Sequence, residues 1–210
     1  MNCDPIARWY RFAEYLTLGR ALEKRRREYL SQAATAKRAL LLGDGDGRFT
    51  VEFLNENRTA QVDSIDLSKN MLELAARRVE KHCLARDFPT PDVRLLRADA
   101  LTFPFEGPYD LVVTHFFLDC FSDAQIEELV GRIARAATPD AKWIVSEFQT
   151  PNLAAALLVK ALYLAFRVLT GSRVRRLPVY SNALTANGFK QITRKTALYG
   201  TLVSESWERS

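Results

Sequence analysis

The sequence predicts an α/β protein whose mainly parallel sheet is covered by helices on both faces. Apolar stretches of strand length alternate with stretches of helical periodicity from residue 37 onwards. The stretch 109–115 is almost continuously apolar, as expected of a strand buried on both sides. A short turn at Leu198-Tyr199-Gly200 joins the last two predicted strands, which must therefore run antiparallel. We expect a doubly wound, seven-stranded sheet that ends in an antiparallel hairpin.

Each predicted element rests on a local pattern. Ser68 is suited to cap a helix in which Met71, Leu72, Ala75 and Val79 recur with helical spacing. With 210 residues and 48% hydrophobic content, the chain is the size of one α/β domain, 1–210. In chain order we predict helices 5–17 and 18–34, strand 38–43, helix 48–57, strand 61–66, helix 68–85, strand 93–98, strand 109–115, helix 122–137, strand 141–148, helix 152–170, a short helix at 180–187, and strands 189–196 and 199–207.

The stretch Leu40–Phe49 carries three alternate glycines between a predicted strand and a predicted helix. Gly43, Gly45 and Gly47 can adopt positive φ and let a ligand approach the main chain, and the helix that follows presents unpaired N–H groups. A dinucleotide-binding turn would place its third glycine where Arg48 stands. The turn therefore predicts a nucleotide-like ligand and argues against NAD.

Polar residues follow the predicted strands at the places where ligands bind in open α/β sheets. Asp66 ends the second strand about 20 residues after the turn, where a carboxylate can accept both hydroxyls of a ribose. Asp99 follows the third strand and His115 ends the fourth. The alternative is that Asp66 and Asp99 only cap the helices that follow them.

From about Lys37 to Glu147 the chain resembles the class I S-adenosylmethionine-dependent methyltransferases. GDGDG is similar to their glycine-rich first motif, SIDLSKNML to the second, RADAL to the third and YDLVVTHFFLDCF to the fourth. The resemblance implies a Rossmann-like fold and S-adenosyl-L-methionine as the cofactor. It implies that the glycines approach the methionine and ribose parts, that Asp66 binds the ribose and Asp99 the adenine amino group, and that the end of the fourth motif lines the methyl group. Together with Asp44, which is considered below, the predicted cofactor-binding residues are Gly43, Gly45, Gly47, Asp66, Leu67, Met71, Asp99, Ala100, Leu101, Thr114, His115 and Phe116.

One position departs from the family pattern. The family often has an acid two residues before the first glycine, and Leu41 stands there. We hypothesise that Asp44, inside the turn, partly replaces that carboxylate, because a fixed negative charge favours a ligand that carries an ammonium and a sulfonium.

His115 is the histidine best placed for chemistry. Its ordinary pKa suits a general base near neutral pH, and a base helps when the methyl acceptor is a hydroxyl or an acidic carbon. Asp119, four residues later, is the candidate to orient the imidazole. The alternatives are that His115 only shapes the pocket and that Asp119 faces water. No metal-ligand pattern is present.

Composition points to a cytoplasmic enzyme. The net charge is +5, but the basic run at 23–28 is flanked by acids and is typical of a solvated helix face, so we expect no nucleic-acid partner. Cys3, Cys83 and Cys120 are odd in number and far apart, which favours a reducing compartment. Asp4, Arg8 and Arg11 argue against a cleavable signal.

The predicted regions outside the cofactor core are candidates for the acceptor site. We assign 1–36 to an N-terminal helical lid, 37–148 to the cofactor-binding core, 149–188 to an acceptor-lid insertion and 189–210 to the C-terminal hairpin. Helix 152–170 is apolar around most of its circumference, so it is a lid, a peripheral membrane contact, a dimer contact or an ordinary packed helix. We expect methyl transfer to a small lipophilic or aromatic acceptor, such as a quinone precursor, by a monomer or homodimer. The alternatives are a cofactor-binding regulatory or scaffold protein and an RNA or protein methyltransferase.

Overall fold

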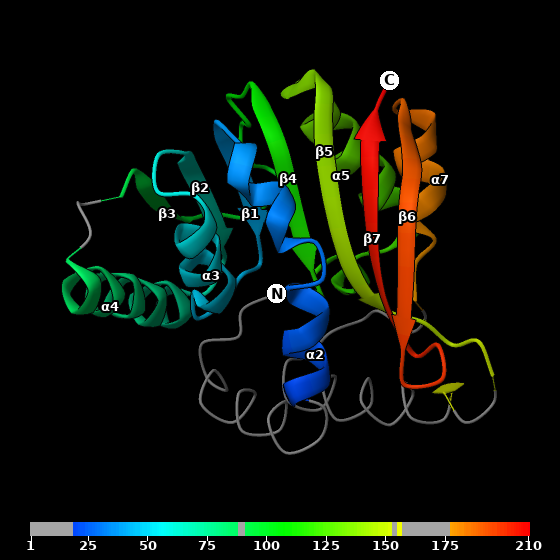
Figure 1. Cartoon of the computed structure of the whole chain (residues 1–210). Helices are drawn as coiled ribbons and strands as arrows, with labels where there is room; N and C mark the ends of the chain where they lie inside the picture. Colours follow the sequence, from blue (N-terminus) through cyan, green and yellow to red (C-terminus); the bar gives the residue numbers. More distant parts are fainter. Residues whose placement is uncertain (1–18, 88–90, 153–154, 157–176) are drawn as a thin grey trace.

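A computed structural model describes residues 19–87, 91–152, 155–156 and 177–210 of the chain (Figure 1). Its strands form one seven-stranded sheet in the order β3-β2-β1-β4-β5-β7-β6. The predicted fold class is confirmed: five neighbouring strands are parallel, and β7 runs antiparallel to both β5 and β6. The strands are β1 Arg38–Leu42, β2 Gln61–Asp66, β3 Val93–Arg97, β4 Tyr109–His115, β5 Ala137–Phe148, β6 Phe189–Ala197 and β7 Leu202–Arg209.

The register of the parallel strands brings their ends to one edge of the sheet, which we call the carboxyl edge. Leu42, the last residue of β1, pairs with Ile65 of β2 on one side and with Thr114 of β4 on the other. Asp66 pairs with Arg97 at the end of β3. The residues that follow β1, β2, β3 and β4 therefore lie side by side, which is the arrangement that the sequence predicts for the ligand site.

Helices cover both faces of the sheet. On one face, η2 and α3 pack on an apolar cluster that includes Phe49, Phe53 and Val113; on the other, α5 and α7 pack on a cluster built around Trp143. In Figure 1, α2 lies near the end of the sheet where β4 and β5 finish. The helices are α2 Gly19–Arg26, η2 Leu30–Thr35, α3 Arg48–Glu56, α4 Lys69–Arg86, η3 Leu118–Cys120, α5 Asp123–Arg135 and α7 Tyr180–Ala186, of which η2 and η3 are 3₁₀ turns.

Local hydrogen bonds explain where several helices begin. The Ser68 hydroxyl accepts from the Met71 N–H at 3.2 Å, as predicted for the start of α4. Ser122 and Gln125 form a reciprocal capping box at the start of α5. These caps satisfy N–H groups that the first turn of a helix leaves without partners.

Three predicted boundaries are wrong. The helix predicted at 18–34 is broken, because α2 ends at Arg26 and a turn separates it from η2. The strand predicted at 141–148 begins four residues earlier, at Ala137, where it pairs with Tyr109 across an irregularity in the register. The last strand begins at Leu202 and not at 199, because residues 198–201 form the turn.

A buried charged network links the first strands. The Asp63 side chain is 1% exposed and accepts hydrogen bonds from Arg94 (2.5 and 2.7 Å), from the Tyr109 hydroxyl (2.8 Å) and from Arg38 (3.3 Å). Burial alone would raise the pKa of Asp63, but the hydrogen bonds from Arg94 and Tyr109 outweigh it and lower that pKa. The carboxylate is thus charged and held by several donors.

Some predictions fall outside the described residues. These are helix 5–17 and most of helix 152–170, with the membrane-contact and dimer alternatives that depend on it. Within the described part of the chain, no helix combines the length and the apolar character needed to cross a membrane.

Candidate functional site

The glycine-rich turn has the conformation that its sequence requires. Gly43, Gly45 and Gly47 all have positive φ, of 70°, 63° and 77°. A Cβ at Gly47 would lie 2.8 Å from Cα and Cβ of Ala75 in α4, and a Cβ at Gly43 would collide with the ring of Phe117. At Gly45 a Cβ would meet only Met71 Sδ, at 3.8 Å. The turn therefore leaves room beside Gly45, next to one of the predicted cofactor residues.

Asp44 holds the start of α3. Its carboxylate accepts from the N–H groups of Phe49 (3.1 Å) and Thr50 (2.9 Å) and from the Thr50 hydroxyl (2.6 Å). Burial raises the pKa of Asp44, and the bonds from Thr50 and the charge of Arg26 oppose that rise. Both carboxylate oxygens thus have structural partners, and a role for Asp44 in holding the cofactor stays a prediction.

Asp46 connects the turn to α4. Its carboxylate pairs with Arg78 at 2.8 Å and with Arg48 at 3.2 Å, and its carbonyl accepts from Arg78 at 2.9 Å. These contacts support the shape of the turn from the side of α4.

Asp66 and Asp99 both follow strands at the carboxyl edge. Asp66 is half-buried, and its carboxylate accepts from the Ser68 N–H at 2.8 Å. Asp99 is exposed and accepts from the Leu101 N–H at 2.9 Å. Neither acid is the N-cap of the next helix, because Ser68 caps α4 and no helix begins at Asp99. Of their neighbours in the predicted set, Leu67 and Leu101 are partly exposed and Met71 and Ala100 are buried.

The fourth motif ends with side chains that point to opposite faces of the sheet. Thr114 is fully buried and accepts from the Trp143 indole at 3.0 Å on the α5 side. His115 lies on the other side, where its ring meets Phe49 edge-on with centroids 4.7 Å apart. Phe116 has a left-handed φ of 54°, which is uncommon for a bulky residue and is typical of functional turns.

His115 is buried, 6% exposed, and neither of its ring nitrogens has a hydrogen-bond partner among the described residues. Burial and the nearby charge of Arg26 lower the pKa of His115 well below the ordinary histidine value. The imidazole is therefore neutral near pH 7, and the surroundings that keep it neutral also make it a weaker base than an exposed histidine. Asp119 does not orient it through a hydrogen bond, in contrast to the sequence-based expectation.

Glu147, in β5, is a site residue that the sequence motifs do not reveal. Its Oε1 accepts from the N–H groups of Phe117 (3.0 Å) and Leu118 (2.7 Å), directly after Phe116. Burial and the charge of Asp119 raise the pKa of Glu147 well above the ordinary value. The charge of Asp119 thus raises the pKa of Glu147, and the Glu147 carboxyl holds the turn that follows Phe116 through these two hydrogen bonds.

Arg26 of α2 is a second residue that sequence reasoning missed, because it stands in a run of charges that predicts a solvated face. Its neighbour Arg25 is only 5% exposed. The Arg26 guanidinium lies 5.3 Å from the centroid of the Phe116 ring, and its charge acts on both Asp44 and His115. The charge of Arg26 is therefore felt both at the glycine-rich turn and at the end of β4.

The geometry defines a doubly wound α/β protein with its candidate site at the carboxyl edge. A family model described as a methyltransferase domain matches residues 39–140. A demethylmenaquinone methyltransferase of Thermus thermophilus is 33% identical over 150 residues, 70% of this chain and 64% of that protein. A 2-phytyl-1,4-naphtoquinone methyltransferase of Nostoc is 28% identical over 95 residues, 45% of this chain and 38% of that protein.

The fold agrees with these sequence matches. The solved structure of an O-methyltransferase family protein from Burkholderia thailandensis superposes with a TM-score of 0.69 at 16% identity, over 87% of this chain and 55% of that one. The chain belongs to the class I S-adenosylmethionine-dependent methyltransferase family. It spans less than two thirds of the length of each of these three proteins.

Proposed function

We propose that this chain transfers a methyl group from S-adenosyl-L-methionine to a small aromatic acceptor of the quinol class. The observation that carries the proposal is the meeting of the glycine-rich turn, Asp66 and His115 at the ends of adjacent parallel strands. The similarity to two proteins named as naphthoquinone-type methyltransferases supports the choice of acceptor.

The residues at the carboxyl edge suit this cofactor. Gly45 leaves space against the main chain, Met71 borders that space, and Asp66 is placed to accept from ribose hydroxyls. Asp99, with its exposed carboxylate at the end of β3, is placed for the adenine amino group. When bound, S-adenosyl-L-methionine supplies a methyl group on a positively charged sulfur, which a nucleophile attacks in line.

The chain's own part in the reaction is to position the acceptor and to take its proton. Neither ring nitrogen of His115 has a hydrogen-bond partner in the described structure, so one of them can accept a hydrogen bond from an acceptor hydroxyl. The negative charge that forms on the acceptor oxygen then offsets the lowered pKa of the imidazole and lets it take the proton. The apolar surroundings, with the Phe49 and Phe116 rings, exclude water from the reacting groups.

Calorimetric titration with S-adenosylhomocysteine tests cofactor binding, and an assay with a reduced naphthoquinone tests transfer. We expect saturable binding, and we expect Asp66→Ala to weaken it about tenfold or more, since hydrogen bonds to a charged group are lost. Asp92→Ala, which removes a carboxylate from an exposed position just before β3, is the matched control. Absence of binding to the unaltered chain would refute the proposal, and binding without methyl transfer would favour a regulatory or scaffold role.

The role of Asp44 has its own test. If the charge of Asp44 favours the cofactor, Asp44→Asn should weaken S-adenosylhomocysteine binding. The loss in binding free energy should exceed the loss in the free energy of unfolding that comes from the weakened start of α3. Equal affinity in the two proteins would leave Asp44 with its structural role alone. The cytoplasmic location, the oligomeric state and any peripheral membrane contact remain predictions.

A further inference from the structure

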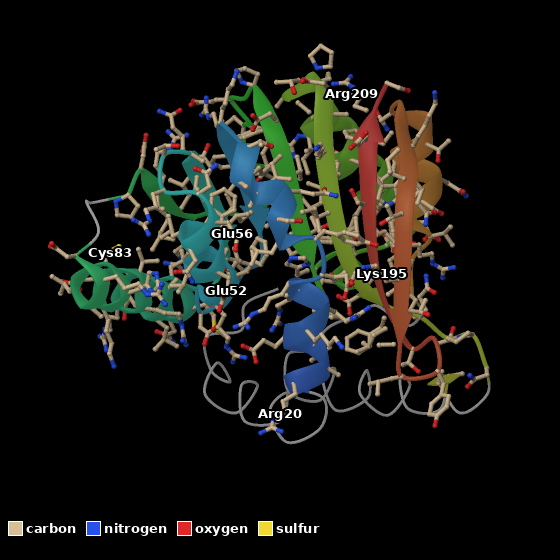
Figure 2. All side chains as sticks on the ribbon, in the orientation of Figure 1. Arg20, Glu52, Glu56, Cys83, Lys195 and Arg209 are labelled. Carbon is tan, nitrogen blue, oxygen red and sulfur yellow. The ribbon has the colours of Figure 1, made fainter. Side chains whose placement is uncertain are left out.

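The end of α2 is attached firmly to the carboxyl edge. The carbonyl of Arg25 accepts from the hydroxyls of Ser146 in β5 (3.2 Å) and Ser204 in β7 (3.0 Å). The Arg25 side chain also forms an ion pair with Glu28 at 2.5 Å. Glu28 in turn pairs at 2.7 Å with Lys195 of β6, and Lys195 is labelled in Figure 2. These contacts set the position of the next residue, Arg26.

Arg26 is adjacent to His115 because of the strand register. Ser146, which bonds to the carbonyl of Arg25, pairs directly with His115 across β4 and β5. The guanidinium of Arg26 lies 5.3 Å from the centroid of the Phe116 ring, in the residue after His115. A permanent positive charge is thus held beside a neutral imidazole whose nitrogens have no partner within the described structure.

This pairing suits an acceptor that must lose a proton. An imidazole with a lowered pKa takes a proton from a weakly acidic hydroxyl only where the oxyanion left behind is stabilised, and a guanidinium stabilises it through charge-assisted hydrogen bonds. An amine acceptor that reacts as a neutral nucleophile gains nothing from a fixed cation at this place. The cation does favour the reaction of a phenol or hydroquinone, because the reactive form of such an acceptor is the anion, which the cation stabilises.

We propose that Arg26 binds the ionised oxygen of the methyl acceptor. This inference rests on the proposed function and extends it to a further residue. The acceptor O–H proton moves to a ring nitrogen of His115, and the electron pair stays on the oxygen and its conjugated ring. The oxygen or a ring carbon then forms a bond to the methyl group, while the sulfur–methyl bond breaks and leaves its pair on sulfur. Where a ring carbon is methylated, its C–H bond then breaks, and the proton moves to the oxygen, which restores the aromatic ring.

The role of Arg26 can be tested by binding as well as by turnover. A nitronaphthol is a suitable probe, because its ionised form absorbs at longer wavelengths than its neutral form. With S-adenosylhomocysteine present, the unaltered protein should bind the anion and lower the pKa of the bound probe. Arg26→Gln should weaken binding of the anion about tenfold to a hundredfold, and Arg26→Lys should retain part of it, since Lys keeps the charge but not the planar guanidinium.

The matched control is Lys24→Gln, which removes the same charge from an exposed position of the same helix. It should leave probe binding and turnover unchanged. Arg26→Gln should also keep its affinity for S-adenosylhomocysteine within about threefold, because the lost contact is to the acceptor. Its thermal unfolding is measured alongside, and Arg26→Lys provides the second variant should Arg26→Gln fold poorly.

Two results would overturn the inference: unchanged binding of the anionic probe by Arg26→Gln, or a loss confined to cofactor affinity, which would place Arg26 against the cofactor carboxylate. Methylation of dimethoxynaphthalene as fast as naphthohydroquinone would also contradict the inference, because dimethoxynaphthalene has no hydroxyl that could form the anion. These results differ from a failure of the proposed function, in which the unaltered protein itself would bind no S-adenosylhomocysteine.

Discussion

Replacement of Glu147 should destabilise the protein by an amount that depends on whether the new side chain still accepts hydrogen bonds. Glu147 is 1% exposed, and its Oε1 accepts from two backbone N–H groups, those of Phe117 and Leu118. Glu147→Ala leaves the buried Leu118 N–H and the partly buried Phe117 N–H without this acceptor, at a cost of up to about 1–3 kcal/mol each, or about 2–6 kcal/mol together. Glu147→Gln keeps a carbonyl oxygen in the same place and should cost less than about 1 kcal/mol.

Urea unfolding followed by circular dichroism measures the difference, and thermal unfolding should show Glu147→Ala melting roughly 5–20 °C below Glu147→Gln. Methyl transfer should fall in Glu147→Ala even where it is fully folded, because the turn after Phe116 loses its support. Equal unfolding free energies for the two variants would refute the reasoning, since they would mean that the two hydrogen bonds contribute nothing net.

The same residue predicts a pH dependence of stability. Burial and the charge of Asp119 raise the pKa of Glu147 above its ordinary value of 4.5, so the folded protein holds this proton after the unfolded chain has lost it. The contribution of Glu147 to the unfolding free energy should therefore decline as pH rises above about 4.5, by up to about 1.4 kcal/mol per pH unit until the folded carboxyl ionises. Glu147→Gln has no titratable carboxyl at this position, so its unfolding free energy relative to that of the unaltered protein should rise as pH increases above about 4.5. A difference that does not change with pH would contradict the raised pKa of Glu147.

Three further predictions concern the turn, the core and the base. Gly47→Ala should lower the unfolding free energy by about 2 kcal/mol or more in urea titrations, because φ is 77° and the new Cβ would meet Ala75; a change below about 0.5 kcal/mol would contradict this close packing. Asp63→Asn should cost about 3–5 kcal/mol by the same measurement, since it removes the negative charge from a buried ion-pair network, whereas Tyr109→Phe should cost about 1 kcal/mol; similar losses in both would show that the charge is unimportant. The kcat/KM profile should stay level as pH falls through about 6.5, because the pKa of His115 is lowered and its neutral form persists; an acid limb centred near 6.5 that His115→Gln abolishes would contradict the burial argument.

Much of the site could be predicted from the sequence because its features depend on short stretches of chain. Gly43, Gly45 and Gly47 occur where the backbone turns with positive φ, and that requirement is local. Asp66 and Asp99 follow strands, and parallel strands bring their ends to one edge whatever the details of packing. The mainly parallel sheet and its final antiparallel pair followed from the alternation of elements and the short turn at 198–200, whereas the order of the strands in the sheet came from the structure.

Other features depended on how separate elements meet. The run at 23–28 is charged at every position, so periodicity alone does not distinguish the buried side of the helix from the solvated side. Only the docking of α2 on Ser146 and Ser204 buries Arg25 and directs Arg26 to the end of β4.

The sequence by itself determined the sheet, the glycine-rich turn and the acids at the strand ends, since backbone geometry and hydrophobic periodicity are encoded over a few neighbouring residues. The tertiary structure alone decided that Glu147 supports the fourth motif and that His115 is neutral beside Arg26. Burial and charge are properties of the surroundings of a side chain, and those surroundings come from residues far apart in the chain.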